Sequence, residues 1–356
     1  IKKYFKKQNR QPTDIELESI AQTWSEHCKH TIFAAKIDDN EDSARMPGES
    51  ENSGSADHEN QRALQNEEGL YKGYIKRATN DIIKKQKEGK LRAHGASLPT
   101  GQAGAQAKRG SGFASQSEAE PTKESFCVSV FSDNAGGIIF DEDWIITDNA
   151  ETHNSPSALD PFGGAITGII GVNRDCLGFG KGAKPIINKY GFCVGNPSDK
   201  ELIYRDKDLQ NPALSPQRIL EGVIDGVNAG GNCSGIPTPQ GFVYFHDGYK
   251  GKPLIFVGTV GLIPRKINDK NSWEKKAQKG DKIVVIGGRV GLDGIHGATF
   301  SSEALTSGSP ATAVQIGDPI TQKKFSDALI KEARDLDLYN SITDNGAGGI
   351  SCSVPE

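Results

Sequence analysis

Apolar residues at helical spacing mark the start of the chain. Thr13-Asp14-Ile15-Glu16 follows a proline and has the pattern of a capping box, which typically opens a helix. An apolar face follows at roughly helical spacing, made by Ile15, Ile20 and Trp24. This pattern predicts a helix that brings His27 near its C-terminal end.

Residues 41–123 break this pattern. Large apolar residues are sparse there except in one helical patch near Leu70–Lys84, and Lys, Gly, Ser, Gln and Ala dominate after it. Such a segment buries too little apolar surface to offset the entropy lost on ordering. We therefore predict an insertion over 41–123 that is largely disordered apart from one helix.

Strand-like apolar runs follow the insertion, interrupted by a helix that opens at Ser215-Pro216. Strands and helices thus mix, which predicts an α/β or α+β fold. The expected strands are Phe126–Phe131, Gly137–Phe140, Trp144–Thr147, Gly191–Val194, Phe242–His246 and Leu254–Leu262.

A second unit begins near Lys279. Lys282–Gly288 has the pattern of a short buried strand, and a helix around Phe325–Leu336 leads into the loop Asp344–Gly349. The sequence stops soon after, which we interpret as a fragment. The predicted domains are an N-terminal helical segment (1–40), the insertion (41–123), a β-rich domain (124–270) and the first part of a second α/β domain (271–356).

Composition restricts the class of protein. The chain has 356 residues, enough for two domains, and its formal net charge of -4 argues against a general nucleic-acid binder. No stretch is apolar enough to span a membrane and no signal peptide opens the chain, so we expect a cytoplasmic location. The six cysteines include no C-x-x-C pair, which favours reduced thiols over a zinc or disulfide framework.

The densest chemistry follows the expected strand Trp144–Thr147. Glu151–Ser157 contains a carboxylate, an imidazole, an amide and hydroxyls, and a glycine-spaced run from Gly163 to Gly182 contains Arg174-Asp175. We expect this run to be a loop whose backbone N–H groups approach phosphate, beside carboxylates that hold Mg²⁺. We interpret the segment as a nucleotide-handling site, and the alternative is a polar loop with incidental charges.

Other motifs leave their alternatives open. His27 fits a catalytic histidine or a capped, partly buried one, and His27, Cys28 and His30 also suit zinc. The turns after Gly287 fit ordinary strand ends, and Asp318-Pro319 fits a helix entry. Asp344 beside its glycines suits either a metal or phosphate site or a plain loop.

Together these motifs resemble the phosphoribosylformylglycinamidine synthase family of purine biosynthesis. The matching pieces stand in the family's order: Thr23–Cys28, Glu151–Asn154, Gly163–Asp175, Asp293–Ser302, Gln315–Pro319 and Asp344–Gly349. The resemblance implies the first of two similar halves, cut inside its second domain. It also implies that the β-rich domain pairs into a barrel-like sheet with a second copy, from the other half or a homodimer partner.

The resemblance further implies an ATP-dependent carbon–nitrogen ligase. Formylglycinamide ribonucleotide, ATP and ammonia would give the amidine, ADP and phosphate through an iminophosphate, with Mg²⁺ bound. No glutaminase motif is visible, so a glutaminase domain or subunit would supply ammonia. Two alternatives stay open: a non-catalytic half with a structural nucleotide site that docks a glutaminase, and another ATP-using enzyme of the fold, such as aminoimidazole ribonucleotide synthetase.

Site roles come from the same resemblance. The catalytic histidines would be His27 and His153, and the metal-binding carboxylates Glu151, Asp175 and Asp344. The substrate would meet Thr152, Asn154, Ser155, Arg174 and Gln315. ATP would meet His30, Asn149, Gly164, Gly168 and Gly171, although Asn149 stands where many relatives place a lysine.

Overall fold

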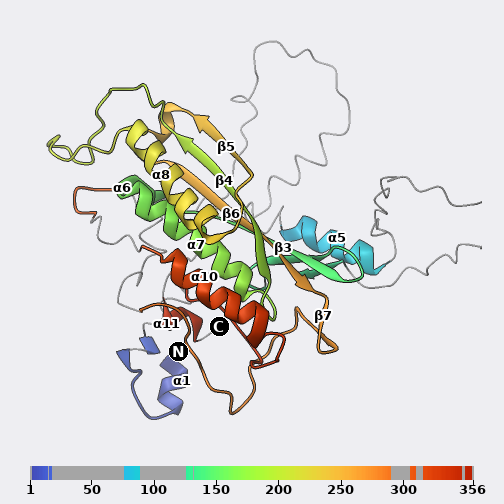
Figure 1. The fold of residues 1–356 in the computed structure, drawn as a ribbon. Coiled ribbons are helices and arrows are strands. Elements are labelled where there is room, and N and C mark those ends of the chain that lie inside the picture. The colour runs from blue at the N-terminus through green and yellow to red at the C-terminus, as the bar shows by residue number, and fades with distance from the viewer. Residues whose placement is uncertain are drawn as a thin grey trace, which may run out of the picture. The chain divides into compact units, whose positions relative to one another are not determined.

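The computed structural model describes residues 2–14, 16–17, 76–88, 126–130, 132–289, 305–309, 316–346 and 349–354. The chain splits into two compact units. One unit joins Ile1–Cys28 to Val128–Glu356, and the other is Lys29–Cys127, whose described helix is α5 (Arg77–Lys87). The larger unit carries the sheet and the site residues that the structure describes (Figure 1).

The larger unit is built on a six-stranded mixed sheet with the order β1-β2-β3-β6-β4-β5. β3 and β4 both pair antiparallel with β6, whereas β5 pairs parallel with β4. The strands are β1 (Cys127–Ser129), β2 (Gly136–Ile139), β3 (Trp144–Thr152), β4 (Lys184–Val194), β5 (Gln240–Phe245) and β6 (Leu254–Pro264). The mixed α/β fold is thereby confirmed, with β3 and β4 longer than their apolar runs predicted.

Two helices, α7 (Pro161–Gly178) and α8 (Pro216–Gly230), cover one face of this sheet (Figure 1). Each begins at a capping side chain: Asp160 accepts a hydrogen bond from Gly163 N (3.0 Å), and Ser215 accepts one from Arg218 N (3.2 Å). The predicted helix at Ser215-Pro216 is confirmed.

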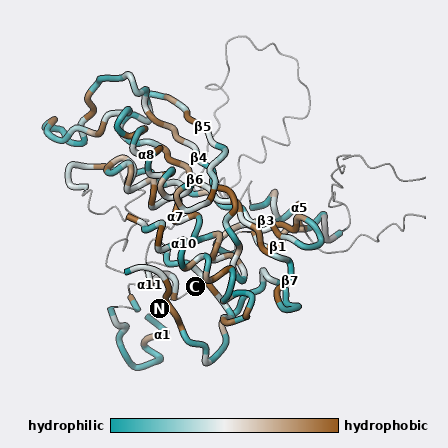
Figure 2. Tube along the Cα trace, viewed as in Figure 1, coloured by the Kyte–Doolittle hydropathy of each residue, from teal (hydrophilic) through white to brown (hydrophobic). Residues whose placement is uncertain are grey.

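Apolar side chains fill the space between these helices and the sheet. The largest are Ile169 of α7, Phe192 of β4 and Ile255 of β6, all fully or almost fully buried. Figure 2 shows hydrophobic stretches alternating with hydrophilic ones along the sheet and its helices. Burial on this scale dominates the stability of the larger unit. This buried core also holds α7 against β6 and β3.

Short elements connect the sheet. α6 (Asn154–Leu159) follows β3, and the 3-10 turns η3 (Asn232–Ser234) and η4 (Asp247–Tyr249) flank β5. After β6, the small hairpin of β7 (Lys266–Ile267) and β8 (Lys270–Asn271) leads out of the sheet.

The C-terminal part contains α10 (Pro319–Ala328), a π-helical turn (Leu329–Ala333) and α11 (Ile350–Ser353). Asp318 caps α10 by accepting hydrogen bonds from Ile320 N (3.0 Å) and Thr321 N (3.1 Å). The predicted helix entry is confirmed.

The strand predicted at Lys282–Gly288 is wrong for this structure. No strand forms there, and Ile283 and Val284 are 75% and 74% exposed. None of the described strands runs beside this apolar run, so its backbone has no ladder partner and its side chains have no sheet face to cover. An apolar pattern signals a strand only when a neighbour is there to pair with it.

The N-terminal segment begins with α1 (Lys2–Lys7). Beyond it, Thr13 N donates to Glu16 Oε2 (2.8 Å) and Glu16 N donates to Thr13 Oγ1 (3.2 Å), which confirms the capping box. The rest of the predicted helix lies outside the described residues.

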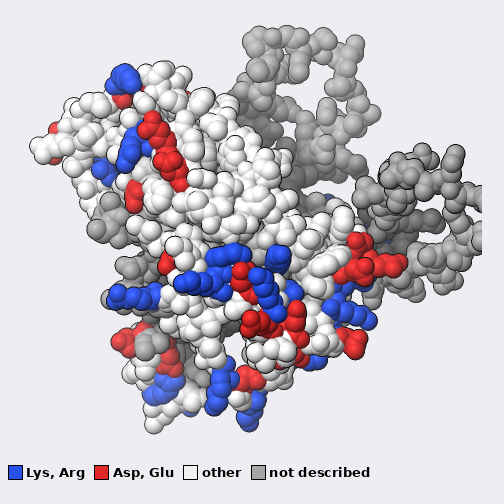
Figure 3. All heavy atoms as spheres, in the orientation of Figure 1, with Lys and Arg blue, Asp and Glu red and all other residues white. Residues whose placement is uncertain are grey.

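Charges of both signs mix on the surface. Figure 3 shows Lys and Arg side chains beside Asp and Glu side chains over α10, while the surface over β4 and β6 carries fewer charges. On this face no large area carries a single sign. Among the described helices, none has both the length and the apolar character that crossing a membrane requires.

Candidate functional site

His153 occupies the junction between β3 and α6. Its backbone N donates to Ile255 O (2.9 Å), while Asn154 Oδ1 accepts from Ile255 N (2.8 Å). Ser157 Oγ donates to His153 O (2.5 Å). His153 and Asn154 are therefore held against β6, and Ser157 of α6 holds the carbonyl of His153, so the imidazole leaves the backbone from a fixed point.

The imidazole of His153 is half-buried, and its Nδ1 has no solvent contact and no hydrogen-bond partner among the described residues. Burial lowers the pKa of His153 to about 4, because the charged form loses hydration. The positive charge of Arg174 acts in the same direction, and a bond to the backbone of Gly164 opposes it. The ring is therefore neutral near pH 7 and able to accept a proton.

Carboxylates gather beside it on β3 and α7. Asn149 Nδ2 donates to Asp175 Oδ2 (2.8 Å), and Asn149 Oδ1 is buried without a partner. Burial raises the pKa of Asp175 well above its ordinary value, and the negative charges of Asp344 and Glu151 raise it further. Three carboxyl groups thus share one electrostatic environment.

The third side of the site comes from the C-terminal part. Arg174 Nε lies 3.4 Å from Asp344 Oδ2, although the two residues are 170 positions apart. Asn134 Nδ2 donates to the other oxygen, Asp344 Oδ1 (3.2 Å). This contact joins α7 to the loop before α11. The sequence did not predict Asn134 as a site residue. Its only local sign of a role was its position just before Gly136-Gly137.

The glycine-rich loop predicted over Gly163–Gly182 is wrong in its main part, because α7 occupies Pro161–Gly178. Backbone N–H groups inside a helix bond to its own carbonyls and cannot cradle phosphate. The glycines instead allow close packing. A Cβ on Gly164 would lie 2.4 Å from Ser157 N, and one on Gly168 would lie 3.1 Å from His153 Cβ.

The structure places the remaining predicted residues as follows. Thr152 ends β3 and is half-buried, and Ser155 is fully buried in α6. Gly171 lies one turn before Arg174 on α7. Outside the described residues lie His27, His30 and Gln315, and with them the zinc alternative that includes Cys28.

Among the described residues, no three His, Cys, Asp or Glu side chains form a ready-made metal cage. Mg²⁺ commonly takes only one or two protein carboxylates and completes its shell with phosphates and water. The oxygen donors Glu151, Asp175 and Asp344 fit that chemistry. A cation beside them would also offset their mutual repulsion.

Comparison with known protein families separates the chain into three matched parts. Residues 1–30 match the formylglycinamide ribonucleotide amidotransferase linker domain. Residues 132–263 match the N-terminal domain of AIR synthase related proteins, and residues 278–356 match the C-terminal domain of the same proteins.

Relatives extend the likeness over the whole chain. The phosphoribosylformylglycinamidine synthase subunit PurL of Picrophilus torridus is 30% identical over 358 aligned positions, covering 100% of this chain and 36% of the relative. The chain belongs to the phosphoribosylformylglycinamidine synthase family. The PurL subunit of Staphylococcus haemolyticus is 38% identical over 63% of this chain and 28% of its own length. The chain thus spans about a third of the relatives that it matches along its whole length.

Solved structures of the family show the same fold. PurL of Thermotoga maritima complexed with FGAR matches with a TM-score of 0.55 and 25% identity, covering 98% of this chain and 39% of that one. The same protein complexed with ATP matches with a TM-score of 0.51 and 21% identity, covering 98% and 37%.

Proposed function

We propose that this chain supplies part of an active site that converts formylglycinamide ribonucleotide, ATP and ammonia to formylglycinamidine ribonucleotide, ADP and phosphate. The observation that carries this proposal is the meeting of His153, Arg174 and Asp344 from three separate segments. Family membership supports it, and so do the complexes of T. maritima PurL with FGAR and with ATP.

The reaction needs two steps. The amide oxygen of the substrate attacks the γ-phosphorus of ATP, so that ADP leaves and an iminophosphate forms. Ammonia then attacks the activated carbon, the carbon–oxygen bond breaks, and phosphate departs. Positive charge must stabilise the phosphoryl oxygens in both steps.

Residues of this chain suit these tasks. Neutral His153 accepts a proton as ammonia attacks, since burial keeps its ring uncharged. Arg174 balances the charge of phosphate, and Asp344 holds its guanidinium in place. Glu151, Asp175 and Asp344 would hold Mg²⁺, which would supply further positive charge to the phosphates when bound.

Other assignments from the family complete the proposal. Substrate contacts come from Thr152–Ser155 and Gln315, ATP contacts from Asn149 and His30, and a second base from His27. Gly164, Gly168 and Gly171 of α7 complete the ATP contacts. We also propose the division into 1–40, 41–123, 124–270 and 271–356, and a cytoplasmic location.

Two partners complete the proposal. The sequence shows no glutaminase motif, and one face of the sheet has no covering layer among the described residues. A glutaminase domain or subunit supplies ammonia. A second copy of the β-rich domain covers the free face of the sheet and closes a barrel with it.

The test is ADP release from Mg-ATP, ammonium and formylglycinamide ribonucleotide by the protein that carries this sequence. His153→Ala should lower the rate by about 100-fold or more, the scale of a lost acid–base group. The matched control is His246→Ala, since His246 is an exposed histidine at the end of β5. Its rate should stay at the starting level.

Two other outcomes would count against the proposal. Equal ADP release in the His153→Ala variant would place catalysis outside this site and leave it as a structural nucleotide site. ADP release with aminoimidazole precursors, but none with formylglycinamide ribonucleotide, would favour the alternative enzyme of this fold, aminoimidazole ribonucleotide synthetase.

A further inference from the structure

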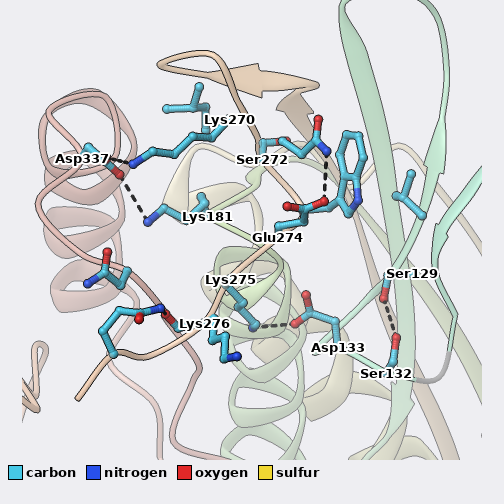
Figure 4. A pocket seen from close by; sticks show the side chains of 16 residues that line it. Ser129, Ser132, Asp133, Lys181, Lys270, Ser272, Glu274, Lys275, Lys276 and Asp337 are labelled. Carbon is cyan, nitrogen blue, oxygen red and sulfur yellow. Dashed lines mark hydrogen bonds and ion pairs between the residues drawn. The ribbon is translucent and has the colours of Figure 1, made fainter. Parts of the chain in front are cut away.

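A cavity of about 600 Å³ lies beside the β7–β8 hairpin. Its lining comes from Ser129, Ser132 and Asp133, from Lys181 after α7, from the hairpin and the chain up to Gln278, and from Asp337 and Asn340 (Figure 4). None of the residues assigned above to catalysis, ATP, substrate or metal lines it. Its volume is that of a pocket for a small molecule.

Positive charge exceeds negative charge in this cavity. Its lining includes four lysines (Lys181, Lys270, Lys275 and Lys276) and three carboxylates (Asp133, Glu274 and Asp337). At one end, Asp337 pairs with two ammonium groups, Lys181 at 3.4 Å and Lys270 at 2.7 Å, and Lys181 also donates to Tyr339 O (Figure 4). Exposed Lys276 makes no ion pair within the described residues. An anion entering the cavity would therefore meet exposed Lys276 and also Lys270, which shares one carboxylate with Lys181.

Lys275, by contrast, is a structural side chain. Its Nζ lies 2.5 Å from Asp133 Oδ1 and donates to Gly178 O (2.6 Å) and Ile342 O (2.8 Å). These bonds close the floor of the cavity and join the end of α7 to the C-terminal part. Lys275 is therefore not offered as a ligand.

The hydroxyl of Ser272 is a second, independent sign of a ligand. The residue is fully buried, and its Oγ has no hydrogen-bond partner within the described residues. A buried polar group without a partner is costly, so such groups usually mark a place that something else fills. Ser272 also lines the cavity, between Lys270 and Glu274 (Figure 4).

The opposite wall is apolar. Val128, Ile267 and Trp273 line it, and all three belong to the core cluster at this end of the sheet. Inorganic phosphate alone would leave that wall and most of the volume unused. A molecule with a flat ring and a phosphate would use both walls.

We propose that this cavity binds a phosphate-bearing small molecule with a flat ring, of the size of a nucleoside monophosphate. Lys270 and Lys276 pair with the phosphate, Ser272 Oγ hydrogen-bonds to the ligand, and Trp273 contacts the ring. The site is separate from the proposed active site and does not depend on its function.

The test titrates AMP into the purified protein by calorimetry, with EDTA present so that magnesium-dependent nucleotide binding is suppressed. One saturable site is expected. The double variant Lys270→Ala/Lys276→Ala should bind about tenfold or more weakly, because two charge-assisted bonds are lost. Lys279→Ala is the matched control, an exposed lysine outside the lining. Adenosine and inorganic phosphate should each bind more weakly than AMP.

Several results would overturn the proposal. These are no saturable binding, undiminished binding in the double variant, or phosphate that binds as tightly as AMP. AMP binding that survives in the double variant but disappears in Arg174→Ala would place AMP in the proposed active site and reject this cavity. If the double variant does not fold, Lys276→Ala alone carries the test, since Lys276 is exposed and has no ion pair to lose among the described residues.

Discussion

At the scale of single residues, environment decides what each side chain can do. His153 is an ordinary histidine whose burial lowers its pKa to about 4. Cys176 is 1% exposed, and burial raises the pKa of its thiol to about 12, so the thiol stays protonated and unreactive. Asn149, in place of a lysine, gives its amide to Asp175 instead of offering a charge.

The carboxylates provide the prediction at this scale. Glu151→Ala and Asp175→Ala should each abolish measurable Mg-ATP binding, because each removes an oxygen donor from the shared cluster. Asp148→Ala should bind normally, since Asp148 lies on the same strand but is exposed and pairs with Lys189 (2.6 Å). Calorimetric titration of Mg-ATP measures all three. Normal affinity in both cluster variants would reject the metal assignment.

At the scale of elements, local patterns set where helices begin, and packing sets how closely they approach. Capping residues start α7, α8 and α10, and those of α8 and α10, Ser215 and Asp318, stand at predicted helix entries. The glycines of α7 lower its intrinsic helix propensity, yet the helix forms because its apolar face is buried against the sheet. Those glycines let α6 and His153 lie against it.

Two glycines of α7 give a matched pair. Gly164→Ala should destabilise the protein by about 1–3 kcal/mol, because its Cβ would collide with the backbone of Ser157. Gly171→Ala should be neutral or stabilising by about 0.5–1 kcal/mol, since the nearest atom to its Cβ is 3.9 Å away. Urea unfolding compares the two. Equal effects would contradict the packing account.

The cap of α10 gives a prediction that depends on pH. The Thr321 hydroxyl, and then backbone N–H groups, hold the pKa of Asp318 below its ordinary value of 3.8. Because the pKa of Asp318 is lower in the folded protein, the cap contributes its full stabilisation above about pH 3.8. That stabilisation is lost as the pH falls through the pKa of the folded protein. Asp318→Ala should cost about 1 kcal/mol near pH 7. Asp318→Asn keeps the cap, so its unfolding free energy should fall less on acidification.

At the scale of the whole molecule, one face of the sheet is left without a layer in the described structure. Edge strand β5 exposes Phe242 by 52% and Tyr244 by 53%. On the other face, α7 and α8 bury side chains of β4 and β6 such as Phe192 and Ile255. An exposed apolar sheet face of this kind usually meets another protein surface.

This face yields the last prediction. We expect the chain, purified alone, to self-associate through it, and Phe242→Lys/Tyr244→Lys to shift the mass toward the monomer. Leu202→Lys should not, since Leu202 is equally exposed (62%) but lies in the loop after β4. Sedimentation velocity measures the mass, and circular dichroism checks that each variant folds. A monomeric parent chain would reject the pairing proposal for this chain by itself.

The sequence by itself determined the features that depend on neighbours along the chain. Apolar runs located the six strands, and Thr13, Ser215 and Asp318 marked helix starts, because capping and burial patterns act over a few residues. The motif around His153 was equally visible. Only tertiary structure decided the rest. It made a helix of the glycine run, left Lys282–Gly288 unpaired, and joined Arg174 to Asp344 across 170 positions. Those outcomes depend on which distant segments pack together, and local sequence carries no record of that.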